Sequence, residues 1–201
     1  MTPPPTSLRE RKKAKTRAAI REHAMRLFEE QGYGATTVDQ IAEAAEVSPS
    51  TFFRYFPAKE DVILVDDWDT VMVAAVRAQP AKVTPIQAVI RGMEQSLAGF
   101  TPEDWAAEAR RQKLFAEVPE LRVRAMHQLG ATVDLMAEVI AERAGLTAGT
   151  LSVRAMAGAI IGVVMATVPA GNLSGESVLE KSDFDQLKTA LGLLERGLPL
   201  E

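Results

Sequence analysis

The 201-residue sequence predicts an all-α protein of about nine helices. Apolar residues recur at helical spacings of three and four along most of the chain, and no segment has the strict alternation of a half-buried strand. Capping residues, glycines and prolines separate these segments at short intervals. The absence of cysteine excludes disulfides, cysteine-ligated zinc and a thiol nucleophile, and two histidines are too few for a His-rich metal site. We therefore expect no cofactor.

The first predicted helix spans residues 8–31, and the glycines of segment 32–34 end it. Residues 1–21 carry seven basic side chains and one acidic one, although the whole chain has a net charge of −4. A basic end on an acidic body indicates a surface that faces DNA. The alternative, which charge alone leaves open, is a solvated basic tail.

Two short helices follow, predicted at residues 37–45 and 48–56. Thr37 and Gln40 have the spacing of a capping box, in which each side chain accepts a hydrogen bond from the backbone amide of the other residue. Only a tight turn with the apolar residue Val47 separates the helices. Two short helices joined in this way are typical of a helix-turn-helix.

The second of these helices has two different faces. Phe52 and Phe56 lie four residues apart and are expected to face the core. Ser48, Ser50 and Thr51 are small and polar, which suits a helix end that enters the major groove. A purely structural three-helix bundle is the alternative, but the further aromatic residues of this helix leave aromatic surface exposed, and such surface usually binds a partner.

The run ATTVDQIAEAAEVSPSTFFRYFPAKE, residues 35–60, resembles the N-terminal signature of TetR-family transcriptional repressors. The resemblance covers residues 15–65. It implies a homodimer that binds palindromic double-stranded operator DNA and releases it when a small molecule binds the C-terminal domain. It also implies three segments. They are a flexible basic arm at residues 1–14, a helix-turn-helix DNA-binding domain at residues 15–62, and a C-terminal helical ligand-binding and dimerisation domain at residues 63–201.

The resemblance also assigns DNA contacts by position, to bases, to the sugar-phosphate backbone and from the arm. The base-reading residues would be Ser48, Pro49, Ser50 and Thr51. The backbone contacts would be Thr36, Thr37, Phe53, Tyr55 and Lys59. The arm would contribute Lys15 and Arg17. The chain departs from the family pattern at Phe53, where a tyrosine hydroxyl is usual, and at Ala58, where a serine or asparagine cap is usual.

The rest of the chain predicts six further helices. Their expected ranges are 59–78, 84–100, 101–117, 119–144, 150–168 and 183–197, with a loop over 171–181. Residues 155–170 carry no charge, but roughly 20 apolar residues are needed to cross a bilayer, so we expect a helix buried in protein. Gly158 and Gly162 allow close backbone approach in a dimer; a central core helix is the alternative.

An effector pocket is expected between the helices at 84–100, 119–144 and 150–168. Its candidate lining residues are Met93, Leu97, Arg110, Leu114, Met126, Leu129, Val133, Met136 and Met165. Methionines adapt to variable apolar ligands, and a basic anchor would suit an acid or an acyl carrier. The chain is similar to actinobacterial family members thought to sense acyl-CoA-like ligands. The alternatives are a filled core and, for Arg110 and Arg111, surface ion pairs.

Three functional classes compete. A ligand-responsive repressor agrees best with the pattern. A DNA-binding regulator controlled by a partner protein is the alternative. An enzyme is not expected, because no nucleophile, base and acid occur together and no Gly-rich phosphate loop is present. The N-terminus lacks a secretory signal, so a cytoplasmic protein without a membrane partner is expected.

Overall fold

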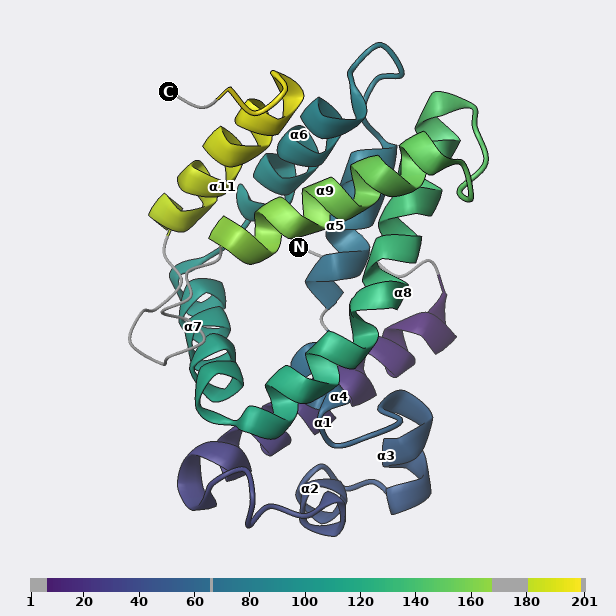
Figure 1. Cartoon of the computed structure of the whole chain (residues 1–201). Helices are drawn as coiled ribbons and strands as arrows, with labels where there is room; N and C mark the ends of the chain where they lie inside the picture. Colours follow the sequence, from purple (N-terminus) through teal and green to yellow (C-terminus); the bar gives the residue numbers. More distant parts are fainter. Residues whose placement is uncertain (1–6, 66, 168–180, 200–201) are drawn as a thin grey trace.

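The computed structural model describes residues 7–65, 67–167 and 181–199. The regular structure in these ranges is ten α-helices, which confirms the predicted all-α class (Figure 1). They are α1 (Leu8–Gln31), α2 (Val38–Ala44), α3 (Pro49–Tyr55), α4 (Asp61–Leu64), α5 (Asp67–Arg77), α6 (Pro85–Leu97), α7 (Pro102–Glu117), α8 (Pro119–Ala144), α9 (Leu151–Thr167) and α11 (Lys181–Glu195).

Capping side chains begin four of the described helices, α2, α3, α6 and α7. Thr37 and Gln40 form the predicted capping box of α2, and Thr101 and Asp104 form another at α7. Gly145 ends α8 in the left-handed conformation, with φ of 65°. These local signals explain why, apart from the fourth predicted helix, the predicted ends lie within three residues of the observed ones.

Two apolar clusters form the core. The first holds α1 to α4 together around Ile20, Phe28, Ile41, Phe52 and Phe56. It also includes Leu114 and Leu121, so α7 and the start of α8 pack against the N-terminal helices. The second cluster joins α5, α6, α8, α9 and α11. Helix α8 spans the distance between the two clusters and contributes to both (Figure 1).

The fourth helix was wrongly predicted as one continuous segment over residues 59–78. The structure instead has α4 and α5, separated at Val65, whose backbone is extended (φ −97°, ψ 105°). The carbonyl groups of Val62 and Ile63 accept hydrogen bonds from arginine side chains of other helices. These tertiary contacts replace the backbone bonds that would continue the helix.

The other end of the chain has two differences from the prediction. The last helix begins at Lys181, so the predicted loop over 171–181 is wrong at its final residue; the rest of that loop lies outside the described residues. The apolar helix α9 buries one face, with Val153, Ala157 and Ile160, while Met165 is exposed. In the described part of the chain, no helix has both the length and the apolar character needed to cross a membrane.

The contact between α5 and α6 depends on Gly92. A Cβ atom at this position would lie 2.6 Å from Cγ2 of Val76 and 2.8 Å from the Val76 backbone nitrogen. Backbone cannot give way as a flexible side chain would, so α5 would have to move away from α6.

We therefore expect Gly92→Ala to lower the free energy of unfolding by about 1–3 kcal/mol, the usual cost of overpacking. Gly130→Ala is the matched control. Gly130 is exposed in α8, and an added methyl group there would meet no atom within 4 Å, so alanine should stabilise the helix slightly. Urea unfolding of the two variants measures both effects, and equal stability of Gly92→Ala and the wild type would contradict this explanation of the α5–α6 contact.

Candidate functional site

Helices α2 and α3 form a tight helix-turn-helix. The Thr37 hydroxyl accepts from the Gln40 amide at 3.2 Å, and the Gln40 side chain accepts from the Thr37 amide at 2.8 Å. In the turn, Glu46 adopts a left-handed conformation with φ of 54°, and the Val47 amide donates to Ala42 at 2.9 Å. The turn thereby fixes the angle at which α3 leaves α2. No sequence signal indicates positive φ at Glu46, because glutamate rarely adopts it.

Helix α3 presents its polar N-terminal end to solvent. Ser48 caps the helix by accepting from the Thr51 amide at 3.1 Å. Its Oγ also lies 2.9 Å from the hydroxyl oxygens of Ser50 and Thr51. Ser48, Pro49 and Ser50 are exposed and Thr51 is half-buried. The small residues predicted to approach bases are thus gathered on one accessible edge.

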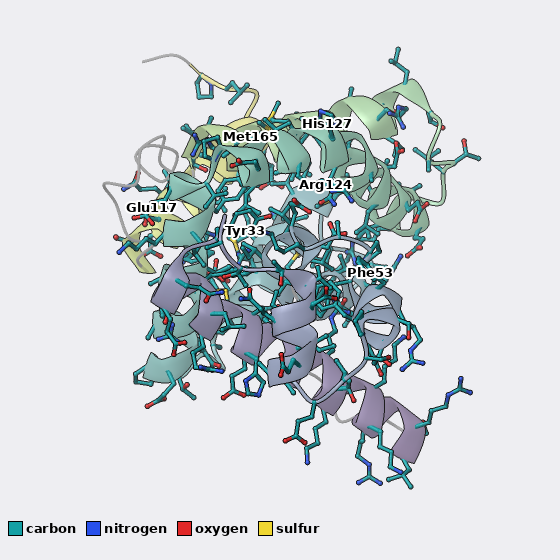
Figure 2. All side chains as sticks on the ribbon, turned by 90° about the horizontal axis from the view of Figure 1, so that it is seen from below. Tyr33, Phe53, Glu117, Arg124, His127 and Met165 are labelled. Carbon is teal, nitrogen blue, oxygen red and sulfur yellow. The ribbon has the colours of Figure 1, made fainter. Side chains whose placement is uncertain are left out.

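The aromatic residues of α3 divide as predicted between core and surface. Phe52 and Phe56 are fully buried, whereas Phe53 is 51% exposed and lies on the outside of the domain (Figure 2). Tyr55 is half-buried beneath the Arg54 guanidinium, which lies 5.4 Å from the ring centre. The buried pair anchors α3 while Phe53 is accessible to a partner.

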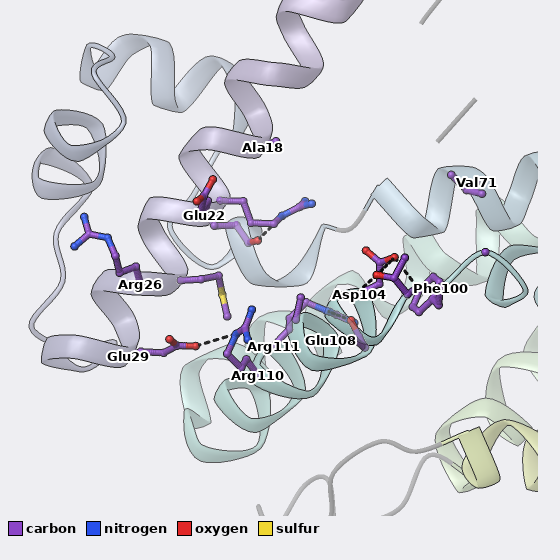
Figure 3. A pocket seen from close by; sticks show the side chains of 16 residues that line it. Ala18, Glu22, Arg26, Glu29, Val71, Phe100, Asp104, Glu108, Arg110 and Arg111 are labelled. Atoms are coloured by element: carbon purple, nitrogen blue, oxygen red, sulfur yellow. Dashed lines mark hydrogen bonds and ion pairs between the residues drawn. The ribbon is translucent and has the colours of Figure 1, made fainter. Parts of the chain in front are cut away.

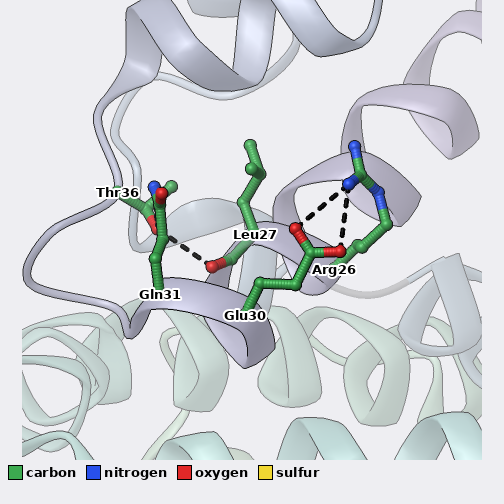
Figure 4. A network of polar contacts seen from close by, with 5 residues as sticks. All are labelled: Arg26, Leu27, Glu30, Gln31 and Thr36. Atoms are coloured by element: carbon green, nitrogen blue, oxygen red, sulfur yellow. Dashed lines mark hydrogen bonds and ion pairs between the residues drawn. The ribbon is translucent and has the colours of Figure 1, made fainter.

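Thr36 was predicted to meet phosphate, but its side chain is only 1% exposed. Its hydroxyl lies 2.9 Å from the Gly32 carbonyl and 3.3 Å from the Leu27 carbonyl, and it accepts from Gln31 Nε2 at 3.1 Å (Figure 4). The prediction is therefore wrong for the Thr36 side chain, which instead supports the end of α1. The neighbouring Thr37 is exposed at the start of α2.

Lys59 also has an internal role that the sequence did not indicate. Its ammonium donates to the carbonyls of Tyr33 and Thr36, each at 2.9 Å, and lies 4.0 Å from the Tyr33 ring centre. Burial and the nearby Glu60 carboxylate raise the pKa of the Tyr33 hydroxyl, so that this ring stays neutral beneath the cation. Contact of Lys59 with DNA stays a prediction.

Residues 8–14 of the predicted flexible arm are helical, as the first part of α1, and residues 1–6 lie outside the described residues. The first turns of α1 extend beyond the other helices with their side chains spread in solvent (Figure 2). Lys15 is exposed, whereas Arg17 is half-buried with its guanidinium 5.2 Å from the Phe56 ring centre. Arg17 therefore packs against the core of the helix-turn-helix, and Lys15 is the more accessible of the two predicted contacts.

Arginine side chains of α1 and α7 donate to backbone carbonyls at the C-terminal end of α4 and so connect the N-terminal helices to the body. Arg21 of α1 donates from Nε to the Val62 carbonyl at 3.3 Å and from Nη2 to the Val65 carbonyl. Arg111 of α7 donates to the Ile63 carbonyl at 3.1 Å. Its other nitrogens hold both carboxylate oxygens of Glu108 at 2.6 and 2.7 Å.

The N-terminal end of α4 is joined to α8 through Asp61. This carboxylate is only 2% exposed and accepts from Gln128 Nε2 at 3.0 Å. Arg124 Nη2 lies 3.4 and 3.5 Å from its two oxygens. Asp61 also accepts from the Ala58 backbone amide at 3.0 Å, so this donor is satisfied although α4 has no side-chain cap. Helix α4 is thus bonded to α1, α7 and α8 together.

The residues predicted to line an effector pocket fall into different environments. Met93 and Met136 are buried in the second cluster, with Leu97, Leu129 and Val133 packed against it. Leu114 belongs instead to the first cluster, beside the helix-turn-helix. Met126 and Met165 are 57% and 49% exposed. The structure therefore does not gather all nine positions around one cavity.

A different cavity contains Arg110. A cleft of about 780 Å³ lies between α1 and α7 and extends to α4, α5 and the segment between α6 and α7 (Figure 3). Arg110 Nε lies 3.3 Å from a Glu29 carboxylate oxygen across it. The sequence anticipated ion pairs for Arg110 and Arg111 but could not indicate this cleft, because its walls are far apart along the chain.

The fold and the exposed end of α3 define a helix-turn-helix transcriptional regulator. Residues 20–65 match the model of bacterial regulatory proteins of the tetR family, and residues 83–199 match that of the MftR C-terminal domain. The chain belongs to the TetR family, whose members are regulators rather than enzymes. It is 35% identical over 153 residues to the HTH-type transcriptional regulator TcmR of Streptomyces glaucescens, covering 72% of this chain and 67% of TcmR.

Solved structures are similar in fold. FadR of Thermus thermophilus, a TetR-family repressor in complex with lauroyl-CoA, superposes with a TM-score of 0.56 and 25% identity, over 92% of this chain and 96% of that one. The fatty acid degradation regulator FadR of Bacillus halodurans has a TM-score of 0.53 and 22% identity, over 92% and 97% of the two chains.

If the helical arm contacts phosphates, deleting residues 1–14 will flatten the salt dependence of DNA binding. The slope of log K against log salt should fall by about 0.9 for each phosphate that the arm no longer neutralises. Fluorescence anisotropy over a salt series measures the slope. Lys82→Gln with Lys113→Gln, a double variant of the body, should leave it unchanged, and an unchanged slope in the deletion would show that the arm is only solvated.

Proposed function

We propose that the protein is a ligand-responsive repressor that binds palindromic operator DNA as a homodimer and releases it when a small lipophilic or acyl-type effector binds. The observation that carries this proposal is the exposed polar edge of α3, backed by buried Phe52 and Phe56 and joined to the body by α4. DNA-binding regulation is common to the family. What we propose beyond it is that this protein represses, that it binds DNA as a symmetric homodimer, and that a small effector releases it.

The proposed base contacts come from Ser48, Ser50 and Thr51, whose hydroxyls can donate to or accept from base edges. Phe53 offers only apolar contact, for example to a thymine methyl group. Backbone contacts are assigned to Thr37, Tyr55 and the basic first turns of α1. Operator DNA lies in the cytoplasm, which is where we propose that the protein acts.

The proposed dimer forms through α9 and α11. Gly158 and Gly162 would meet no atom within 4 Å if each carried a Cβ, so this part of α9 is open in the single chain. Nearby Met165 is also exposed. A twofold dimer would set its two α3 helices about 34–36 Å apart for successive major grooves, which requires a palindromic operator. Light scattering at micromolar concentration tests the dimer, and a monomer would contradict it.

The effector is proposed to act through α4 by a population shift. A ligand that binds better when the α3 helices are spread apart will lower operator affinity in proportion to its preference for that state. The lauroyl-CoA bound to the Thermus thermophilus neighbour supports a lipophilic or acyl-type effector. Control by a partner protein is the alternative, and a thermal-shift screen of lipophilic acids separates the two because a ligand of the native state raises Tm.

Ser50→Ala and Thr51→Ala should each weaken operator binding about tenfold, because each removes hydroxyl contacts to base edges without touching the core. The operator is first selected from random duplex DNA, and affinities are then measured by fluorescence anisotropy. Thr132→Ala, an exposed change in α8, is the control and should bind like the wild type. Wild-type affinity in both α3 variants would contradict the proposed reading edge.

A further inference from the structure

The cleft between α1 and α7 has the form of a ligand site. Its inner surface includes the apolar side chains of Met25, Val71 and Phe100, and charged side chains surround them (Figure 3). A volume of about 780 Å³ is within the usual range for pockets that hold small organic ligands, roughly 300–1,000 Å³. Eight of the sixteen lining residues are charged, so the cleft suits a molecule that carries a charged group beside an apolar part.

We propose that this cleft, rather than the space between α6, α8 and α9, binds the effector, and that the effector is an amphipathic anion whose carboxylate or phosphate pairs with Arg110. This inference rests on the proposed function. The apolar part of the ligand would lie on Met25, Val71 and Phe100.

Arg110 is the cation that we assign to the ligand. Its ion pair with Glu29 is 3.3 Å long, and both side chains are about half exposed, so the pair contributes little and is easily exchanged. Arg26 also lines the cleft, but it already has both carboxylate oxygens of Glu30 at 3.1 Å. A guanidinium has five donors in a planar fork, which can hold a second carboxylate or a phosphate. Arg111, by contrast, is committed to both oxygens of Glu108.

The carboxylates that line the cleft leave the Arg110 guanidinium accessible to an anion. Glu108 is occupied by Arg111 and Gln112, and Asp104 accepts from the Thr101 amide and hydroxyl in the cap of α7. Glu29 can return to water when a ligand takes its place on Arg110. Glu22, the remaining carboxylate, lies almost two helical turns before Glu29 on α1.

The position of the cleft gives the ligand direct access to α4. Arg21 and Arg111 line opposite walls, and these are the side chains that hold the Val62 and Ile63 carbonyls. A ligand that separates α1 from α7 therefore pulls on both bonds. A ligand bound in the cleft would therefore change the position of α4, and with it α3. This movement would not require a change in the second apolar cluster.

The test uses the full-length wild-type protein and two alkyl probes of opposite charge, dodecanoate and dodecyltrimethylammonium, both below their micelle concentrations. Isothermal titration calorimetry measures binding, and anisotropy of labelled operator measures release. Ala107→Phe fills the cleft from an exposed position of α7, and Met25→Trp fills it from α1. Arg110→Gln removes the charge alone, and Thr132→Phe, at an exposed position of α8, is the matched control.

We expect dodecanoate to bind the wild type and release operator, and the cation to bind more weakly. Both filling variants should lose binding, Arg110→Gln should weaken it about tenfold, and Thr132→Phe should leave it unchanged. Wild-type dodecanoate binding in both folded filling variants, no dodecanoate binding by the wild type, or tighter binding of the cation would overturn the cleft assignment.

The outcomes also separate this assignment from the proposed function. If both folded filling variants keep dodecanoate-induced release, the effector binds elsewhere and only the cleft assignment is wrong. If neither dodecanoate nor any lipophile that raises Tm releases operator from the wild type, the proposed ligand response itself fails.

Discussion

Unpaired carbonyl groups at the end of a short helix must find donors, and in α4 the donors come from other helices. Arg21 of α1 and Arg111 of α7 hold the carbonyls of Val62 and Ile63. At the other end, the buried Asp61 carboxylate accepts from Gln128 and pairs with Arg124 on α8. The DNA-reading helices cannot move far relative to α7 or α8 without breaking one of these bonds.

This arrangement combines two kinds of contact with different tolerance for movement. Val62 and Ile63 are fully buried, and apolar burial changes little when a helix slides slightly. The hydrogen bonds to their carbonyls are directional and weaken steeply with angle. Leaving Asp61 buried without its partners would cost about 3–5 kcal/mol, so its contacts must be kept or exchanged as a unit. Such a junction favours a few discrete positions of α4, as an allosteric switch requires.

The sequence predicted what depends on neighbouring residues and missed what depends on distant ones. The caps at Thr37 and Ser48 and the buried pair of Phe52 and Phe56 follow from spacing alone, and they fix α2 and α3. The internal contacts of Lys59 and the break in the fourth helix arise from groups 23 to 48 positions away. The Thr36 hydroxyl is held by groups 4 to 9 positions away, at the end of α1 and just after it. The pocket prediction was limited for the same reason: apolar spacing does not distinguish a core position such as Met136 from a cavity wall.

The most direct test of the junction is hydrogen exchange of the α4 amides. Amides of Ile63, Leu64 and Val65 are bonded within the helix, so their exchange reports how firmly α4 is held. Exchange is followed by mass spectrometry on peptides that contain residues 61–65, in the wild type and in Arg111→Gln. We expect markedly faster exchange in these peptides of the variant, with unchanged exchange in α9. Identical exchange of residues 61–65 in the two proteins would contradict the claim that α7 holds α4 in place.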